Sequence, residues 1–221
     1  MKKLLTILCL VLLSSYSYSE DLPPDKLVER QGITYKINST TPFTGGSVLY
    51  HENGQLQEHG NYKDGEMEGL WELYHDNGQL SWSGNLKNGK REGLSVLYLE
   101  NGQLMMRSNF KDGELDGLRE MYYVDGQLRH KINYKNGKQE GPYESYLENG
   151  QVFERGNHKD GEKHGLWVTY YEDGQLSIRE SYKNGKRDGI DESYAENGRE
   201  YNFSPRCYKN NEEVDMSYCE D

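Results

Sequence analysis

Apolar residues are scarce in this chain, and their scarcity limits the folds open to it. Only 33% of its 221 residues are hydrophobic, and the mean hydropathy is −1.02. A conventional core of two packed layers needs more apolar surface than this in a chain of such length. The composition is therefore compatible with a thin sheet or with a disordered chain. The 19 tyrosines favour the sheet, because each one buries a large ring while its hydroxyl stays hydrated or hydrogen-bonded.

Residues of the kind that enzymes use are few and scattered. No serine or cysteine stands in a nucleophile-elbow sequence. The segment with Asp112, Glu114 and Asp116 matches the first half of a calcium-binding loop, but Tyr123 stands where a bidentate Glu is required, so turn chemistry explains it. The histidines lie at unrelated positions: His51, His59, His75, His130, His158 and His164. We therefore predict a protein that is not an enzyme and has no catalytic residues, cofactor or metal site.

Basic residues are outnumbered by acidic ones, 26 against 37, and the formal net charge is −11. Phosphate backbones and anionic lipid headgroups repel such a chain, so we predict that it binds no nucleic acid and that acidic lipid is disfavoured. A row of basic residues at 24-residue intervals is a local exception: Arg107, Lys131, Arg155 and Arg179. This row fits a solvated face balanced by neighbouring glutamates, and it also fits an extended acidic ligand.

Glycine, in contrast, is frequent and strictly periodic. One series with a 24-residue period stands in Asn-Gly or Asp-Gly pairs: Gly54, Gly78, Gly102, Gly126, Gly150, Gly174 and Gly198. A second series has the same period: Gly65, Gly89, Gly113, Gly137, Gly161 and Gly185. A fixed period of this length marks a repeat array, in which each unit buries its apolar face only against its neighbours.

Each 24-residue unit is predicted to hold one β-hairpin and a tight return to the next. Its Asn-Gly and Asp-Gly pairs indicate two type I′ turns, since both residues tolerate positive φ. In the copy from Leu70 to Gly93, the strands are expected over residues 70–75 and 79–87. Short connections make neighbouring strands antiparallel. The predicted fold is all-β, an elongated single-layer antiparallel meander of about fourteen strands in stacked β-hairpins.

Period-2 alternation predicts that this sheet has one apolar face and one polar face. The apolar face is expected to carry Leu70, Tyr74, Leu80 and Leu86 with their equivalents in other copies. The polar face is expected to carry the Arg107 row.

The repeated residues resemble a known family. The pattern G-x-W-x-x-Y-x-x-N-G-Q-L followed by N-Y-K-[DN]-G-[KE]-x-x-G is similar to the MORN repeat, specifically its bacterial variant, over about seven copies from Pro42 to Glu200. The resemblance implies stacked β-hairpins in a twisted single sheet. Many bacterial proteins of this variant are labelled antitoxin-like, and eukaryotic relatives serve as scaffolds at membranes. Pro142, His158 and Glu200 depart from the pattern.

The N-terminus has the features of a secretory signal peptide. Lys2 and Lys3 precede an apolar run over residues 4–13, and Ser17 and Ser19 stand at the −3 and −1 positions of a cleavage site. The apolar run is too short to span a bilayer. We predict a signal peptide over residues 1–19 and export to the periplasm, cell envelope or medium, with a retained amphipathic anchor as the alternative.

Two cysteines, Cys207 and Cys219, remain after the predicted cleavage. An oxidising compartment favours a disulfide between them, with two free thiols or a metal site as alternatives. We expect residues 20–41 to lead into the repeat array at 42–200, and residues 201–221 to form a C-terminal cap closed by the disulfide.

The predicted function is that of an exported, non-enzymatic repeat protein that acts as a protein-binding module, antitoxin-like or immunity-type. A membrane- or envelope-associated scaffold is the alternative. Three tryptophans are the predicted anchors for a protein partner, Trp71, Trp82 and Trp167, with local packing as their other role.

Overall fold

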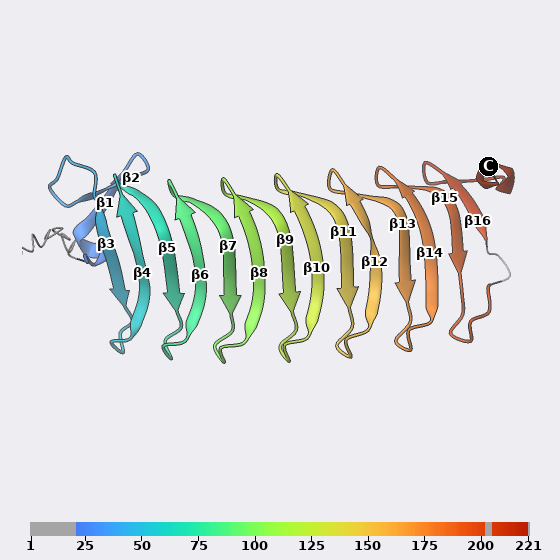
Figure 1. Cartoon of the computed structure of the whole chain (residues 1–221), viewed down its shortest axis with the longest axis horizontal. Coiled ribbons are helices and arrows are strands. Elements are labelled where there is room, and N and C mark those ends of the chain that lie inside the picture. Colours follow the sequence, from blue (N-terminus) through green and yellow to red (C-terminus); the bar gives the residue numbers. More distant parts are fainter. Residues whose placement is uncertain (1–20, 202–204, 221) are drawn as a thin grey trace, which may run out of the picture.

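The computed structural model describes residues 21–201 and 205–220 (Figure 1). The predicted signal peptide lies outside the described residues. The described chain forms one long ribbon in which hairpin follows hairpin in sequence order, with a small two-stranded sheet at the N-terminal end. The predicted all-β, single-layer antiparallel meander is confirmed.

The long sheet has fifteen strands, β3 to β17, each paired with its sequence neighbours. Its last two strands belong to the segment that was expected to form the C-terminal cap. The small sheet consists of β1 (Leu27–Arg30) and β2 (Ile33–Lys36), after a 3-10 helix, η1 (Pro24–Lys26). The strands of the long sheet are β3 (Gly45–Tyr50), β4 (Leu56–Lys63), β5 (Glu66–Tyr74), β6 (Leu80–Lys87), β7 (Lys90–Tyr98), β8 (Leu104–Lys111), β9 (Glu114–Tyr122), β10 (Leu128–Lys135), β11 (Lys138–Tyr146), β12 (Val152–Lys159), β13 (Glu162–Tyr170), β14 (Leu176–Lys183), β15 (Lys186–Ser193), β16 (Arg206–Lys209) and β17 (Glu212–Val214).

The two turns of each unit are of different types. Asn88 and Gly89 both have positive φ, 50° and 72°, between β6 and β7, as the predicted type I′ turn requires. At the other turn only Gly78 has positive φ, 82°, and its N–H donates to the carbonyl of His75. The prediction of type I′ is wrong there. A three-residue loop, closed by the His75 N–H to Gln79 carbonyl bond, leaves an extra residue at the base of the hairpin.

This extra residue divides the predicted apolar set between the two faces. Tyr74 pairs with Leu80, but the next pair is Leu73 with Trp82, so one residue of β6 has no partner. Directly opposed residues share a face, and a one-residue shift moves side chains to the other face. Leu80 therefore lies with Tyr74 and not with Leu86. The expectation of one apolar and one polar face is wrong, because it assumed unbroken alternation.

One face, here called the tryptophan face, contains all three tryptophans. Trp71 and Trp167 are 3% and 2% exposed, and a Cβ atom at Gly60 or Gly156 would collide with their indole rings. Each indole N–H donates 3.1 Å to a backbone carbonyl on the preceding strand. Glycine on one strand thus makes room for tryptophan on the next. This face supplies much of the core of a protein that has only one layer.

The turns at both long edges are hydrogen-bonded to a neighbouring repeat. At the lower edge in Figure 1, the Asn53 amide donates to the Asp76 carbonyl at 2.6 Å. At the upper edge, the N–H of Asn88 donates to Glu68 at 3.1 Å and that of Gly89 to the Met67 carbonyl at 2.9 Å. These bonds link hairpins that the strand ladder already joins, so we expect the edges to be well ordered.

Each end of the ribbon carries further structure. At the first end, the N–H of Phe43 donates to the Thr34 carbonyl, and Leu22 bridges to Ser47 on the outer side of β3. At the last end, a 3-10 helix, η2 (Met216–Cys219), is tied to β16 by the Cys207–Cys219 disulfide. The predicted disulfide is confirmed. The bridge at Leu22 limits pairing with other chains at the β3 edge of the sheet.

Replacing Gly78 with valine is expected to lower the free energy of unfolding by about 1–3 kcal/mol, because a β-branched residue is strained at positive φ. A Cβ there would also meet the Gln55 side chain at 2.6 Å. Gly54→Val is the matched control, since Gly54 has the same φ but no atom within 4 Å of such a Cβ. Urea unfolding followed by circular dichroism measures both. Equal stability of the Gly78→Val variant and the wild type would contradict the turn geometry.

Candidate functional site

The face opposite the tryptophan face, here called the charged face, has a row of opposed charges along its middle. Arg107 on β8 lies opposite Glu120 on β9, which lies opposite Lys131 on β10. Beyond them, each charge again meets its neighbour across one strand pair: Lys131–Glu144, Glu144–Arg155 and Arg179–Glu192. Opposite charges that face one another across strands stabilise the pairing. The predicted basic row is therefore brought together: Glu120 and Glu144 lie between its first three members, and Val168 lies between Arg155 and Arg179.

Ion pairs fix several side chains of this row. The Arg107 guanidinium donates to the Glu120 carboxylate, whose side chain is only 9% exposed. This bond holds the pKa of Glu120 below its usual value, although burial opposes the shift. Arg179 pairs with Glu192 at 3.0 Å. The basic side chains remain close to half exposed, 48% for Arg107 and 44% for Arg179, so they stay accessible to a ligand.

A row of tyrosine and aliphatic side chains runs beside the charges, nearer the lower edge in Figure 1. It begins with the pairs Tyr50–Leu56 and Tyr74–Leu80. Four tyrosine hydroxyls of this row donate to the glutamate two residues earlier, those of Tyr74, Tyr122, Tyr146 and Tyr194, and the Tyr146 bond to Glu144 measures 2.7 Å. Burial and this carboxylate raise the pKa of Tyr146 to about 12. These bonds connect the aromatic row to the charged row.

Exposed leucines line the other side of the charged row. Leu70, Leu94 and Leu166 are 46%, 51% and 46% exposed. Leu70 lies opposite Asn85 and Leu94 opposite Asn109, so asparagines alternate with leucines along the row. The leucines were predicted to be buried on an apolar face. The structure instead leaves them open to solvent beside the charges.

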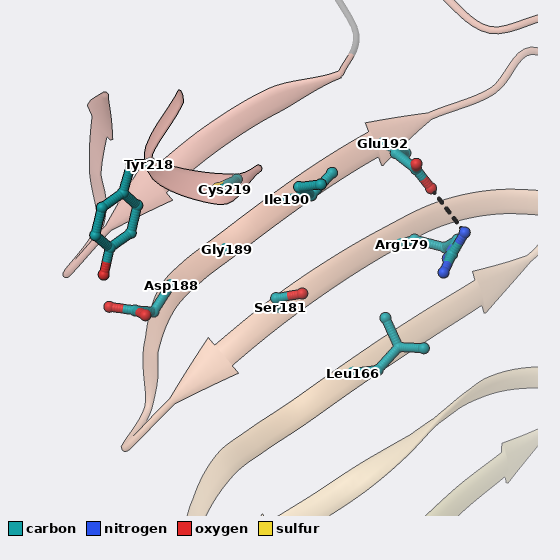
Figure 2. Close-up of a pocket in the computed structure, with 9 residues that line it drawn as sticks. All are labelled: Leu166, Arg179, Ser181, Asp188, Gly189, Ile190, Glu192, Tyr218 and Cys219. Carbon is teal, nitrogen blue, oxygen red and sulfur yellow. Dashed lines mark ion pairs between the residues drawn. The ribbon is translucent and has the colours of Figure 1, made fainter. Parts of the chain in front are cut away.

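At the C-terminal end of this face, η2 covers a cavity of ≈ 510 Å³ (Figure 2). Leu166, Ile190 and the Arg179–Glu192 pair form its floor, and Tyr218 and Cys219 form its wall. Its lining is mixed, so the cavity has no cluster of groups with an evident chemical role. It extends the charged face beneath the cap.

The comparison with known families agrees with this architecture. The model of a family described as MORN repeat variant matches six segments, residues 47–64, 67–88, 91–112, 115–136, 139–160 and 163–184. Together they cover more than half of the chain. The chain belongs to the MORN repeat variant family. No curated protein matches it.

The MORN repeats explain why the motif residues are mainly structural. Each matched segment ends at the first residue of a type I′ turn, such as Asn88 or Asn136. The match gives six repeats of about 22 residues, where the sequence predicted seven copies of 24. The loop at Ala195–Arg199 repeats the turn geometry beyond the last matched segment, because Gly198 again donates to the carbonyl three residues earlier. MORN repeats indicate a repeat protein with a binding or scaffold role.

The three tryptophans lie on the opposite face of the MORN ribbon from the charged row. Trp71 and Trp167 are almost fully buried, so their side chains have little surface to offer a partner. Trp82 is half-buried beneath Arg91, whose guanidinium carbon lies 5.5 Å from the ring centroid. The structure thus gives packing roles to Trp71 and Trp167, and their predicted use as direct anchors has no support. The exposed leucines were missed, because the bulge that places them is not evident in the repeat pattern.

Several polar residues of the MORN repeats have structural partners. His51 and His75 hydrogen-bond the carbonyls of Tyr74 and Tyr98, one repeat further on, at 2.9 and 3.1 Å. Asp116, from the segment that resembles a calcium loop, accepts the N–H of Asn136 at 3.1 Å. Within residues 21–201 and 205–220, no group of three or more His, Cys, Asp or Glu side chains is placed to hold a metal ion. Nor does any helix in these ranges have the length and apolar content needed to cross a membrane.

Proposed function

We propose that the chain is an exported, non-enzymatic protein that binds a protein partner through the charged face. The observation that carries the proposal is the row of exposed leucines, Leu70, Leu94 and Leu166, beside a row of accessible basic residues. Apolar side chains that line up on one surface with polar groups at their border are typical of protein interaction sites. Export rests on the sequence of residues 1–19.

The arrangement favours a protein over an extended acidic ligand. The basic side chains alternate with Glu120, Glu144 and Glu192, so the row presents both signs of charge at the spacing of one strand. A polyanion would meet a carboxylate between Arg107 and Lys131 and another between Lys131 and Arg155, whereas a protein surface of mixed charge could match both signs. An antitoxin-like or immunity-type role is the finer form of this proposal. The alternative is an envelope scaffold, which the hydrogen-bonded stacking of the turns supports.

Capture of envelope proteins by tagged variants tests this proposal. Leu94→Glu places a charge on the charged face, where Leu94 is 51% exposed. Leu73→Glu is the matched control, because Leu73 is 36% exposed on the tryptophan face and is changed to the same residue. We expect Leu94→Glu to lose at least tenfold of the captured partner and Leu73→Glu to retain it. Equal capture by both variants, or loss with Leu73→Glu alone, would exclude the charged face as the binding surface.

A further inference from the structure

We propose that Arg155 and Arg179 hold a carboxylate of the partner protein above Val168, supplied by an acidic side chain that stands next to an apolar one. This inference rests on the proposed function, since it takes the charged face as the binding surface and names the chemistry that this face recognises. Val168 on β13 lies opposite Arg155 on β12 and opposite Arg179 on β14. The two arginines therefore flank one apolar side chain, with their Cα atoms about 10 Å apart.

The chain itself fills the equivalent place with a glutamate two repeats earlier. Glu120 lies opposite Arg107 and opposite Lys131, in the register that Val168 has with its arginines. The Arg107 guanidinium donates to the Glu120 carboxylate. That bond lowers the pKa of Glu120, and the charge of Lys131 lowers it further. This face thus stabilises a carboxylate between two basic side chains, and at Val168 the chain supplies none.

Both arginines retain donors for a ligand. Arg155 is exposed, and within residues 21–201 and 205–220 it forms no ion pair with a carboxylate. Its guanidinium carbon lies 5.5 Å from the centroid of the Tyr170 ring. Arg179 pairs with Glu192 through one nitrogen, and its side chain is 44% exposed. A guanidinium has five N–H donors, so Arg179 is able to bind a second carboxylate.

An open hollow of ≈ 380 Å³ adjoins this place on the charged face. Pro142, Leu166 and Val168 supply apolar lining, beside Arg155 and Asn157. An apolar side chain that enters the hollow would cover part of Leu166, which is 46% exposed. Removal of such surface from water stabilises a complex. The occupant that fits is therefore an acidic residue next to an apolar one, on an exposed segment of the partner.

The C-terminal cap leaves this place open. In Figure 2, Tyr218 and Cys219 lie over one end of the neighbouring cavity, and Arg179 lies at the other end with Glu192. Arg179 has its 44% exposure with η2 in position. A narrow segment of a partner is therefore able to reach Arg179 beside the cap.

The net charge of −11 does not prevent this contact. At physiological ionic strength, exposed charges more than about 8 Å apart are largely screened from one another. The nearest carboxylates of the same row, Glu144 and Glu192, lie two strands from Val168, at about 10 Å. The two arginines lie only one strand away. A carboxylate above Val168 therefore interacts mainly with the two guanidinium groups.

Titration with blocked peptides tests the site. The probe is acetyl-Leu-Glu-Leu-amide, and acetyl-Leu-Gln-Leu-amide is its uncharged control. With isotope-labelled arginine, nuclear magnetic resonance should show that the Glu peptide shifts the Nε–H signals of Arg155 and Arg179, which Arg155→Lys and Arg179→Lys variants assign. The Glu peptide should bind about tenfold more tightly than the Gln peptide. Equal binding of both peptides, or no shift at either arginine with millimolar Glu peptide, would overturn the proposal.

A substitution at Val168 tests the site from within the chain. Val168→Glu supplies an internal carboxylate, as Glu120 does, and should weaken binding of the Glu peptide about tenfold or more. Val96→Glu is the matched control, because Val96 lies in the same row between Ser83 and Arg107, away from the site. It should weaken binding less than about threefold. Equal weakening by the two variants would count against the site.

Folding of these variants is checked by circular dichroism. Val168→Glu should fold, because Glu120 is as buried in the same row, 7% exposed against 8% for Val168. Arg155→Gln is a second variant with its change at an exposed side chain, and it should weaken binding of the Glu peptide about fivefold. Unchanged binding in Arg155→Gln would overturn the role of this arginine.

The possible failures are distinct. Acetyl-Leu-Gln-Leu with a free C-terminal carboxylate should bind more weakly than the Glu peptide, and tighter binding would overturn an acidic side chain as the source. Loss of the envelope partner with Leu94→Glu, but not with Val168→Glu, would overturn the carboxylate site and support the charged face. Binding of the Glu peptide at both arginines, with full capture by Leu94→Glu, would support the site and overturn the proposed function.

Discussion

Replacing Trp71 with alanine is expected to lower the free energy of unfolding by about 3–5 kcal/mol, the cost of removing a buried aromatic side chain. The indole is 3% exposed and packs edge-on against Tyr62, with ring centroids 5.2 Å apart. Its N–H donates to the carbonyl of Asn61. A single-layer sheet has no second layer to close the cavity, and Gly60 beneath the ring has no side chain to fill it. Denaturant unfolding followed by far-ultraviolet circular dichroism measures the change.

Trp82→Ala is the matched control for this prediction. Trp82 lies on the same face but is only half-buried, so its loss should cost less than half as much as the loss of Trp71. A second variant, Gly60→Val, forces a side chain into the space of the Trp71 ring and should destabilise the same repeat. Equal losses for the two tryptophans would contradict the assignment of Trp71 to the core.

Removing the Cys207–Cys219 disulfide is expected to lower the free energy of unfolding by about 3 kcal/mol in the chain-entropy model. The two Cα atoms are 6.1 Å apart and twelve positions apart in sequence. The bond holds η2 over the charged face, so its loss should also open the cavity that Tyr218 walls. The Cys207→Ser, Cys219→Ser double variant is compared with the wild type by thermal melting.

Reductant provides the control for the disulfide. It should lower the melting temperature of the wild type and leave that of the double serine variant unchanged. Intact mass of the native protein should rise by two hydrogens on reduction. Thiols that react freely with an alkylating reagent before reduction would contradict both the bond and the predicted oxidising compartment.

Much of the fold follows from short-range residue chemistry. Asn88 and Gly89 accept positive φ where other residues would be strained, and their recurrence every 24 residues sets the hairpin positions. The connections are too short for crossovers, so the meander order follows from the turns alone. Cys207 and Cys219 were the two cysteines expected in the exported chain, which made their pairing predictable.

The candidate site was less predictable. Val168 lies between Arg155 and Arg179 only because of the pairing register, and no local pattern marks that neighbourhood. The basic residues were evident in the sequence because they recur with a fixed period. The glutamates opposite them were not evident, because they belong to other strands and only the pairing register brings them beside the basic residues. Trp71 and Trp167 were taken as partner anchors, because large side chains that vary among copies resemble binding residues until their burial is known.

The sequence by itself determined the repeat, the antiparallel meander and the disulfide, because each depends on a turn, a period or a pair of residues that can be read along the chain. Only the tertiary structure decided which side chains share a face. One extra residue at the base of each hairpin, as between Leu80 and Trp82, reverses the alternation and leaves leucines such as Leu94 beside the charges. Alternation is a property of an unbroken strand, and a bulge is visible only once both paired strands are in place.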